Sequence, residues 1–254
     1  FDVHIKNGEV IDGTGAPKFK SDIVIDKGKI IGVFPAENGD VRDPSENHFL
    51  SNFKAKHTIN AENKIISPGF IDVHTHDDDN VFLDPSMSSK ISQGVTTCVA
   101  GNCGISLAPF SYTGEVPAPI ALLGKSEVFR FPRVSDYKEE FNNKPSSVNL
   151  ALLTGHSMLR VEAMNGEFAR PATTKEISKM VDKLKLALED GSIGLSTGLA
   201  YPAANDAPTS EIIELAKILP EFDGIFTTHM RNEAVDVIKS VNETINISSA
   251  AKVR

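Results

Sequence analysis

Short apolar segments separated by turn residues dominate the start of the chain. Two pairs of these segments flank the dipeptides Asn7-Gly8 and Lys27-Gly28, which are typical of tight β-hairpin turns. A third pair of short apolar segments lies at residues 58–60 and 64–66. This alternation predicts a small antiparallel sheet over residues 1–66, without obvious chemistry of its own.

From Ser67 onward, apolar strands alternate with amphipathic helices. Residues Thr173 to Glu176 have the sequence of a capping box, and apolar residues at helical spacing follow them as far as Gly191. Two later segments show the same spacing up to Pro220 and Ile245, and we interpret all three apolar stripes as core. Such alternation implies parallel β-α units. The strands that we expect are 70–74, 95–101, 148–154, 193–197 and 224–229.

Two segments depart from these patterns. Residues 34–56 are polar and without periodicity, which predicts a loop or an insertion. Residues 104–147 are rich in proline and aromatic side chains and are longer than a simple crossover needs. We predict a large loop over the strand ends there, with a short helix near 135–142, and such loops often form pocket walls.

Composition and charge narrow the class of protein. The 254 residues are 40% apolar and carry a net charge of −8, which argues against nucleic acid or an anionic membrane as partner. No apolar run approaches the roughly 20 residues that span a bilayer, and no signal peptide is recognisable. Two cysteines are too few for a disulfide scaffold and fit a reducing compartment, so we expect a cytoplasmic protein.

The first candidate for chemistry is the pair His74 and His76, which lies at and just beyond the end of the strand expected at 70–74. Side chains alternate along a strand, so the two imidazoles point the same way and can bind one metal ion. Asp77, Asp78 and Asp79 follow them, and we favour a solvated acidic loop over carboxylates that orient an imidazole.

Further reactive residues fall at the ends of other expected strands. Cys103 follows the second strand between glycines, His156 follows the third, and His229 ends the fifth. In a β/α barrel these strand ends meet on one face, where the active site lies. A thiolate can bind zinc or bridge two metals, which favours Cys103 as a ligand over a buried turn residue. His156 fits a ligand-shell or a structural role equally well, and Cys98 fits the core.

The segment Pro68–His76 resembles the first-strand signature of the amidohydrolase superfamily. Other segments resemble, more narrowly, the D-aminoacylases, which are N-acyl-D-amino-acid deacylases. These segments are collinear over nearly the whole chain, and the Asn-Cys-Gly element is the most specific. They are Ser92–Thr97, Gly101–Pro109, Gly155–Arg160, Gly194–Pro202 and Thr228–Glu233.

This resemblance implies a fold, a reaction and a set of ligands. The expected fold is α/β: a (β/α)₈ TIM-type barrel over residues 67–254, of which only about the first five strands are present, beside a small β-sandwich portion at 1–66. The expected reaction is zinc-dependent hydrolysis of the amide bond of an N-acyl-D-amino acid, a small-molecule substrate. Cys103 matches the residue that replaces a carbamylated lysine, and His229 matches a ligand of a tight zinc site. His74 and His76 match a second, weaker site, and Tyr201 matches a substrate-binding tyrosine.

The resemblance also implies functional residues outside this sequence. A further zinc-binding histidine, a lysine, the catalytic aspartate and a substrate-binding arginine are expected beyond Arg254, so we assign no catalytic residue within the chain. We therefore expect a fragment that is inactive alone. Loop 34–56 is also longer than the family suggests.

Other readings stay open at this point. Another amidohydrolase reaction, namely cyclic-amide hydrolysis or deamination, is the nearest alternative to deacylation. A non-catalytic domain that binds metal, or none, is the alternative from a different class. The preferred D-amino-acid side chain and the oligomeric state do not follow from the sequence.

Overall fold

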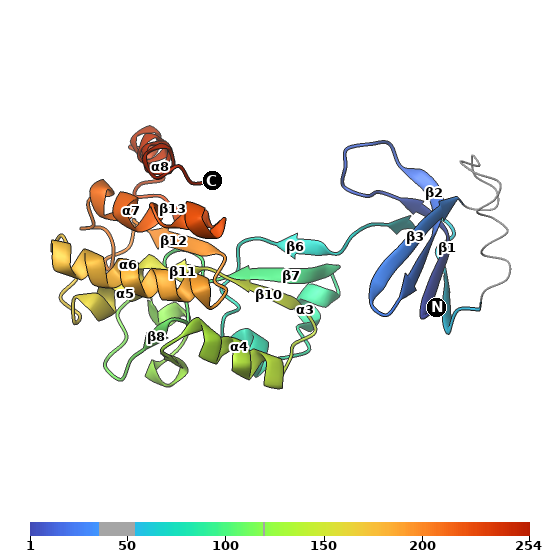
Figure 1. Ribbon diagram of the computed structural model, residues 1–254, viewed down its shortest axis with the longest axis horizontal. Helices are drawn as coiled ribbons and strands as arrows, with labels where there is room; N and C mark the ends of the chain where they lie inside the picture. The colour runs from blue at the N-terminus through green and yellow to red at the C-terminus, as the bar shows by residue number, and fades with distance from the viewer. Residues whose placement is uncertain (36–53, 119) are drawn as a thin grey trace. The chain divides into compact units, whose positions relative to one another are not determined.

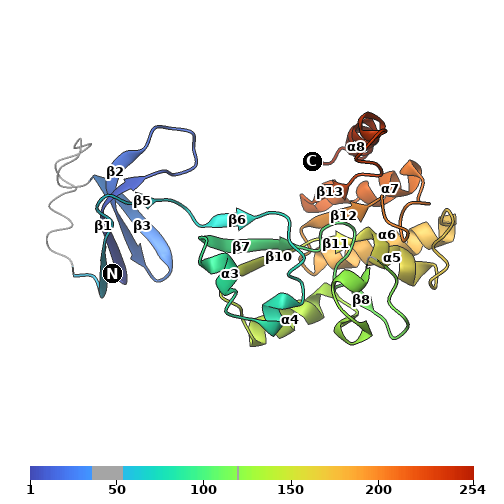
Figure 2. The ribbon, with the colours of Figure 1, turned by 180° about the vertical axis from the view of Figure 1, so that it is seen from behind.

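The computed structural model describes residues 1–35, 54–118 and 120–254, and the chain divides into two compact units, Phe1–Gly69 and Phe70–Arg254. Figure 1 colours the first unit in blue and cyan, and Figure 2 shows the same elements from behind. Among the described helices, none is long and apolar enough to cross a membrane.

The first unit is one mixed sheet. Its strand order is β3-β2-β1-β4, and β5 also pairs with β1. The β2–β3 hairpin turns at Lys27-Gly28, where both residues have positive φ, so the hairpin expected there is confirmed. The strands are β1 (Val3–Val10), β2 (Phe19–Asp26), β3 (Lys29–Pro35), β4 (His57–Asn60) and β5 (Ile65–Ile66).

The prediction of a hairpin turn at Asn7-Gly8 is wrong, because both residues lie inside β1. Asn7 has a φ of 64°, as a hairpin turn requires, but the chain continues forward through a shift in register between Ile5 and Gly8. A β-bulge uses the same left-handed conformation as a tight turn. The positive φ that the dipeptide favours is therefore present, in a bulge instead of a reversal.

The prediction that residues 58–60 and 64–66 form a strand pair with each other is also wrong. Both β4 and β5 pair with β1, and both run parallel to it. The bulge divides the edge of β1, so that β4 pairs with Val3–Lys6 and β5 with Glu9 and Val10. The sheet is therefore mixed and not antiparallel. Most of the loop expected at 34–56 lies outside the described residues.

The second unit contains a series of parallel strands. β7 lies between β6 and β10, and β12 lies between β11 and β13, as both views show. The strand expected at 148–154 is divided into β10 and β11, which joins these two sets. Every residue of β12 is buried, as is usual for parallel strands covered on both faces. The bounds are β6 (Phe70–Asp72), β7 (Val95–Ala100), β10 (Asn149–Leu152), β11 (Thr154–Gly155), β12 (Gly194–Gly198) and β13 (Ile225–His229).

The helices follow these strands in chain order. The expected capping box is present at the start of α6, where Thr173 accepts from the Glu176 backbone and Glu176 accepts from the Thr173 backbone. The bounds are α2 (Asn80–Leu83), α3 (Ser88–Ile91), α4 (Val134–Asn143), α5 (His156–Ala163), α6 (Thr174–Glu189), α7 (Thr209–Ala216), η3 (Leu219–Phe222) and α8 (Val237–Ala251).

The apolar stripe of α8 is not core, contrary to expectation. Ile238 and Ile245 are 70% and 57% exposed, whereas Ser240, Ile247 and Ala251 are buried. Helical spacing identifies an apolar face but not what covers that face. In the described part of the chain, that face of α8 contacts solvent.

The segment 104–147 is more ordered than a loop. It contains the antiparallel pair β8 (Phe110–Ser111) and β9 (Arg130–Phe131), the short helices η1 (Ile120–Leu122) and η2 (Ser126–Val128), and α4, which confirms the helix expected near 135–142. Phe110, Phe129 and Tyr137 are all at most 2% exposed. The aromatic residues of this segment therefore form core.

Candidate metal centre

His74 and His76 lie just beyond the end of β6. The Thr75 backbone N–H between them donates to the Val99 carbonyl at 3.0 Å, which continues the pairing with β7 past the strand end. The two imidazole rings lie on one side, with centroids 5.8 Å apart. Lys90 bridges Asp72 and Asp77 at 2.8 and 3.0 Å, and so ties the residues on either side of the pair together.

Cys103 lies in a tight turn after β7 and has a φ of 55°. A Cβ atom on Gly101 would stand 2.1 Å from the Leu153 carbonyl oxygen, and one on Gly104 would stand 2.7 Å from a backbone nitrogen. Ser196 Oγ accepts from the Gly104 N–H at 3.0 Å and donates to the Gly101 carbonyl. The glycines on either side of Cys103 thus allow close backbone packing, and β12 fixes the turn.

Asp78 holds the same turn from the other side and is fully buried. Its carboxylate accepts from the N–H groups of Gly101 and Leu107, each at 3.3 Å, and burial raises its pKa to about 7. The interpretation as a solvated acidic loop is therefore wrong for Asp78. A run of three aspartates gives no local signal that backbone donors elsewhere in the fold will receive one of them.

The structure brings three of the expected ligands into one cluster. His74 Nε2 lies 3.1 Å from Cys103 Sγ, and one ligand atom from each of His74, His76 and Cys103 lies within 4.8 Å of the others. Sulfur and nitrogen bound to one tetrahedral zinc lie about 3.5 Å apart, given bonds of about 2.3 and 2.0 Å. His76 Nδ1 is buried and has no hydrogen-bond partner. An unpartnered ring nitrogen beside a thiol and a second imidazole fits a zinc site.

His229 approaches Cys103 from another strand, β13. It ends β13, and its Nδ1 is 3.9 Å from Cys103 Sγ. The Tyr201 hydroxyl is 2.9 Å from the same nitrogen, and the two rings pack with centroids 4.7 Å apart. Cys103 is therefore close to both His74 and His229, and Tyr201 contacts the group through His229.

Burial affects the ionisation of this group in the metal-free protein. It raises the pKa of the Cys103 thiol, with a further contribution from the nearby Glu233 carboxylate. Burial and the neighbouring His74 lower the pKa of His76. Burial and Cys103 raise the pKa of Tyr201. His76 is therefore held in the neutral form that binds metal, while the thiol would lose its proton when a cation binds.

His156 does not join the cluster. It is fully buried at the start of α5, and its Nε2 donates to Glu211 at 3.0 Å. Arg160, one turn later on the same helix, pairs with Glu211 as well. No role for Arg160 or Glu211 was expected from the sequence. A signal was available, because His156 and Arg160 are four residues apart on one face of a helix that is otherwise apolar there.

A sequence profile of the amidohydrolase family matches residues 57–251. The match covers well over half of the chain, so this chain belongs to the amidohydrolase family.

Within this family, the chain is similar to D-aminoacylases and to a related deacylase. The chain is 40% identical to a D-aminoacylase of Alcaligenes xylosoxydans xylosoxydans over 97% of this chain and 48% of that protein. A crystal structure of D-aminoacylase matches with a TM-score of 0.89 and 42% identity, over 100% of this chain and 50% of that one. A Bordetella bronchiseptica N-acyl-D-glutamate deacylase, solved with zinc and a phosphonate inhibitor, matches with a TM-score of 0.89 and 38% identity, over 99% and 50%. The chain thus spans about half the length of these relatives.

Proposed function

We propose that the protein hydrolyses the amide bond of N-acyl-D-amino acids to a carboxylate and a D-amino acid. The observation that carries this proposal is that Cys103 Sγ lies 3.1 Å from His74 Nε2 and 3.9 Å from His229 Nδ1, at the ends of parallel strands. Similarity to D-aminoacylase over 97% of the chain supports the choice of substrate class. Cyclic-amide hydrolysis and deamination stay as alternatives within the same family.

We further propose that the second unit is the first part of a (β/α)₈ barrel and that the first unit is part of a small β-sandwich. Consecutive parallel strands followed by helices support the barrel. The apolar residues Phe70, Ile71 and Val73 of the outer strand β6 and its end are 57%, 61% and 67% exposed. Such exposure fits a strand with a neighbour in the complete barrel.

Cys103 and His229 would hold a tightly bound zinc ion, and His74 and His76 would serve a second, weaker site. A zinc ion bound there would lower the pKa of a water molecule and polarise a substrate carbonyl. The Tyr201 hydroxyl would bind the substrate beside the cluster, since it lies 2.9 Å from His229 Nδ1. We assign no general base within residues 1–254, in line with the aspartate that the resemblance expects beyond Arg254.

The reaction is tested with the complete gene product. We expect amino acid release from N-acetyl-D-amino acids, including the leucine, aspartate and glutamate derivatives, and little or none from the L-enantiomers. Hydantoins and nucleobases serve as comparison substrates. Faster turnover of a hydantoin or a nucleobase than of every N-acyl-D-amino acid would overturn the proposal in favour of one of its alternatives.

The metal site is tested by comparing the two cysteines. Cys103→Ala should lower zinc content, measured by elemental analysis after dialysis, and should abolish activity. Alanine has the same Cβ as cysteine, so the backbone strain at position 103 does not change. Cys98→Ala is the matched control, because Cys98 is also buried but lies inside β7. Equal zinc content in both variants would favour a structural cysteine and exclude Cys103 as a ligand.

A further inference from the structure

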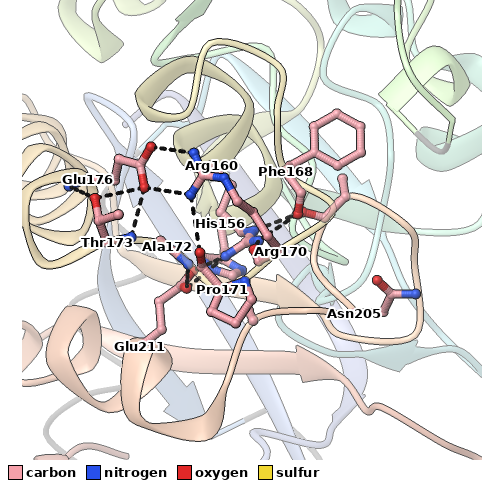
Figure 3. Close-up of polar contacts among 12 residues, drawn as sticks. His156, Arg160, Phe168, Arg170, Pro171, Ala172, Thr173, Glu176, Asn205 and Glu211 are labelled. Carbon is pink, nitrogen blue, oxygen red and sulfur yellow. Dashed lines mark hydrogen bonds and ion pairs between the residues drawn. The ribbon is translucent and has the colours of Figure 1, made fainter.

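Arg160 is a fully buried arginine in which every group of the guanidinium has a partner (Figure 3). Its Nη1 donates to both carboxylate oxygens of Glu211 at 2.5 and 2.7 Å, and its Nη2 donates to the carbonyls of Phe168 and Arg170, both at 2.8 Å. Its Nε donates to the Ala203 carbonyl at 3.0 Å. One side chain thus joins α5, the segment that leads to α6, the loop after β12, and α7.

Glu211 fixes the direction of this guanidinium. It also accepts from His156 Nε2 at 3.0 Å and from the Ala172 N–H at 3.4 Å, so the carboxylate is saturated with donors. Burial alone would raise the pKa of Glu211, but the hydrogen bonds from His156 and Arg160 outweigh it and lower the pKa. The carboxylate therefore stays charged, and it holds Arg160 in one orientation.

The contact with Ala203 connects this buried pair to the candidate site. Ala203 belongs to the loop between β12 and α7, two residues after Tyr201. Within that loop, the Tyr201 carbonyl accepts from the N–H groups of Ala204 and Asn205 at 2.9 and 2.8 Å. The backbone from Tyr201 to Asn205 is therefore one compact turn, and Arg160 anchors its middle.

We propose that Arg160, oriented by Glu211, is a positioning residue for Tyr201. By fixing the carbonyl of Ala203, it sets the turn that places the Tyr201 hydroxyl 2.9 Å from His229. This inference rests on the proposed function, in which Tyr201 binds the substrate beside the metal ligands. A displacement of about 1 Å at such a group can lower the rate about a hundredfold, so an anchor outside the site can control activity.

The alternative role for Arg160 is stability alone, and the chain offers a matched control for it. Arg170 also donates two hydrogen bonds to one carboxylate, from Nη1 and Nη2 to Glu176 at 2.9 and 2.7 Å, but its side chain is 38% exposed and its partners lie away from the Tyr201 loop. Lysine keeps the charge but has three donors on one nitrogen, so it cannot reproduce the fork of an arginine. Arg160→Lys and Arg170→Lys therefore both replace a guanidinium with an ammonium group, the first next to the Tyr201 loop and the second away from it.

The readout is the fluorine NMR spectrum of the complete protein labelled with 3-fluorotyrosine. The resonance that disappears in Tyr201→Phe identifies Tyr201. In the wild-type protein we expect one narrow Tyr201 resonance. In Arg160→Lys we expect that resonance to shift or broaden while those of Tyr112 and Tyr137 stay in place, and in Arg170→Lys we expect no resonance to change.

Kinetics complete the test. Arg160→Lys should lower kcat/KM for an N-acetyl-D-amino acid between about tenfold and a hundredfold, with unchanged zinc content. Arg170→Lys should leave kcat/KM within about twofold of wild type, because it keeps the Arg170 carbonyl that Arg160 binds and the side-chain contacts with Glu176 lie away from the loop. The fluorine result does not depend on turnover. A shifted Tyr201 resonance in a protein without deacylase activity would therefore overturn the substrate assignment and leave the positioning role standing.

Two results would overturn the positioning role. One is an Arg160→Lys protein that melts at a lower temperature but keeps the wild-type Tyr201 resonance and kcat/KM. The other is a Tyr201 resonance that shifts as much in Arg170→Lys as in Arg160→Lys. If Arg160→Lys does not fold, Glu211→Gln, which has the same shape, is expected to move the Tyr201 resonance in the same direction by less.

Discussion

The pairs Arg160–Glu211 and Arg170–Glu176 have the same chemistry in two different surroundings. In each pair the arginine donates two hydrogen bonds to one carboxylate, from Nη1 alone in Arg160 and from Nη1 and Nη2 in Arg170, and the arginines are ten residues apart in the sequence. The first pair is fully buried and joins residues 51 positions apart, whereas the second has an arginine 38% exposed and joins residues six positions apart. The first connects elements of the fold, and the second closes the start of one helix.

The two pairs also contribute differently to stability, because one is buried and the other is exposed to water. Removing two charges from water is unfavourable, so a buried pair contributes little net stability, but breaking it leaves one charge buried without a partner. An exposed pair is screened by water and contributes little whether present or absent. The buried pair therefore specifies one arrangement of the loops around the candidate site, while the exposed pair only supports the cap of α6.

The largest expected effect is on stability. Arg160→Met should lower the free energy of unfolding by about 3–5 kcal/mol, because Glu211 is left charged and buried. Arg170→Met should lower it far less, because water replaces the arginine at Glu176. Urea unfolding of the complete protein measures both. Equal losses in the two variants would show that burial does not distinguish the pairs.

A double-mutant cycle isolates the interaction within each pair. Arg160→Met combined with Glu211→Met should restore much of the stability lost in either single variant, which gives a coupling energy of about 2–3 kcal/mol. The corresponding cycle for Arg170 and Glu176 should give a coupling much closer to zero. The same urea series provides all the values. A larger coupling for the exposed pair would contradict the comparison.

A smaller effect is the loss of stability at mildly acidic pH that His156 should cause. Burial lowers the pKa of His156 below its usual 6.5, so His156 is neutral in the native protein when the unfolded chain already binds a proton. The unfolded state then binds more protons, and stability should fall as the pH drops below 6.5. His156→Gln should weaken this fall between pH 7.5 and 5.5 in chelator-treated protein. The exposed His57 provides the control variant, His57→Gln, which should behave like wild type.

The smallest effect is the loss of stability that Glu176, in the exposed pair, should cause at a lower pH. The hydrogen bond from Arg170, followed by that from the Thr173 backbone, lowers the pKa of Glu176 well below its usual 4.5. The native state then holds the carboxylate charged, so this contribution is present above pH 4.5 and is lost as the pH falls below it. Glu176→Gln should flatten this part of the stability curve, and the exposed Glu167→Gln should not. Identical curves for the two variants would exclude Glu176 as the source.

Local signals predicted much of the second unit. The capping box at Thr173 defined the start of α6 because both of its partners lie within four residues. Apolar runs located the parallel strands, and the ends of these strands brought His74, Cys103 and His229 together. These features depend on sequence neighbours or on a general property of parallel sheets, so one sequence is enough to find them.

The features that were missed depend on distant partners. Asn7 has the same backbone conformation in a turn and in a bulge, and only the pairing of β4 and β5 with β1 distinguishes the two. The sequence around Asp78 favours a solvated residue, and only the folded chain brings the backbone donors of Gly101 and Leu107 to its carboxylate. His156 and Arg160 share one helix face, but their common partner Glu211 lies more than 50 residues further along the chain, so the sequence does not show what they bind.

The left-handed backbone at Cys103, with a φ of 55°, has a consequence for which substitutions the position tolerates. Glycine and asparagine are the residues that adopt this conformation most easily, whereas β-branched residues adopt it at a large cost. In a library of all residues at position 103, glycine and asparagine should therefore give well-folded protein, and valine and isoleucine should give little. Folding alone would select against the cysteine at this position, so its presence there points to selection for the sulfur atom.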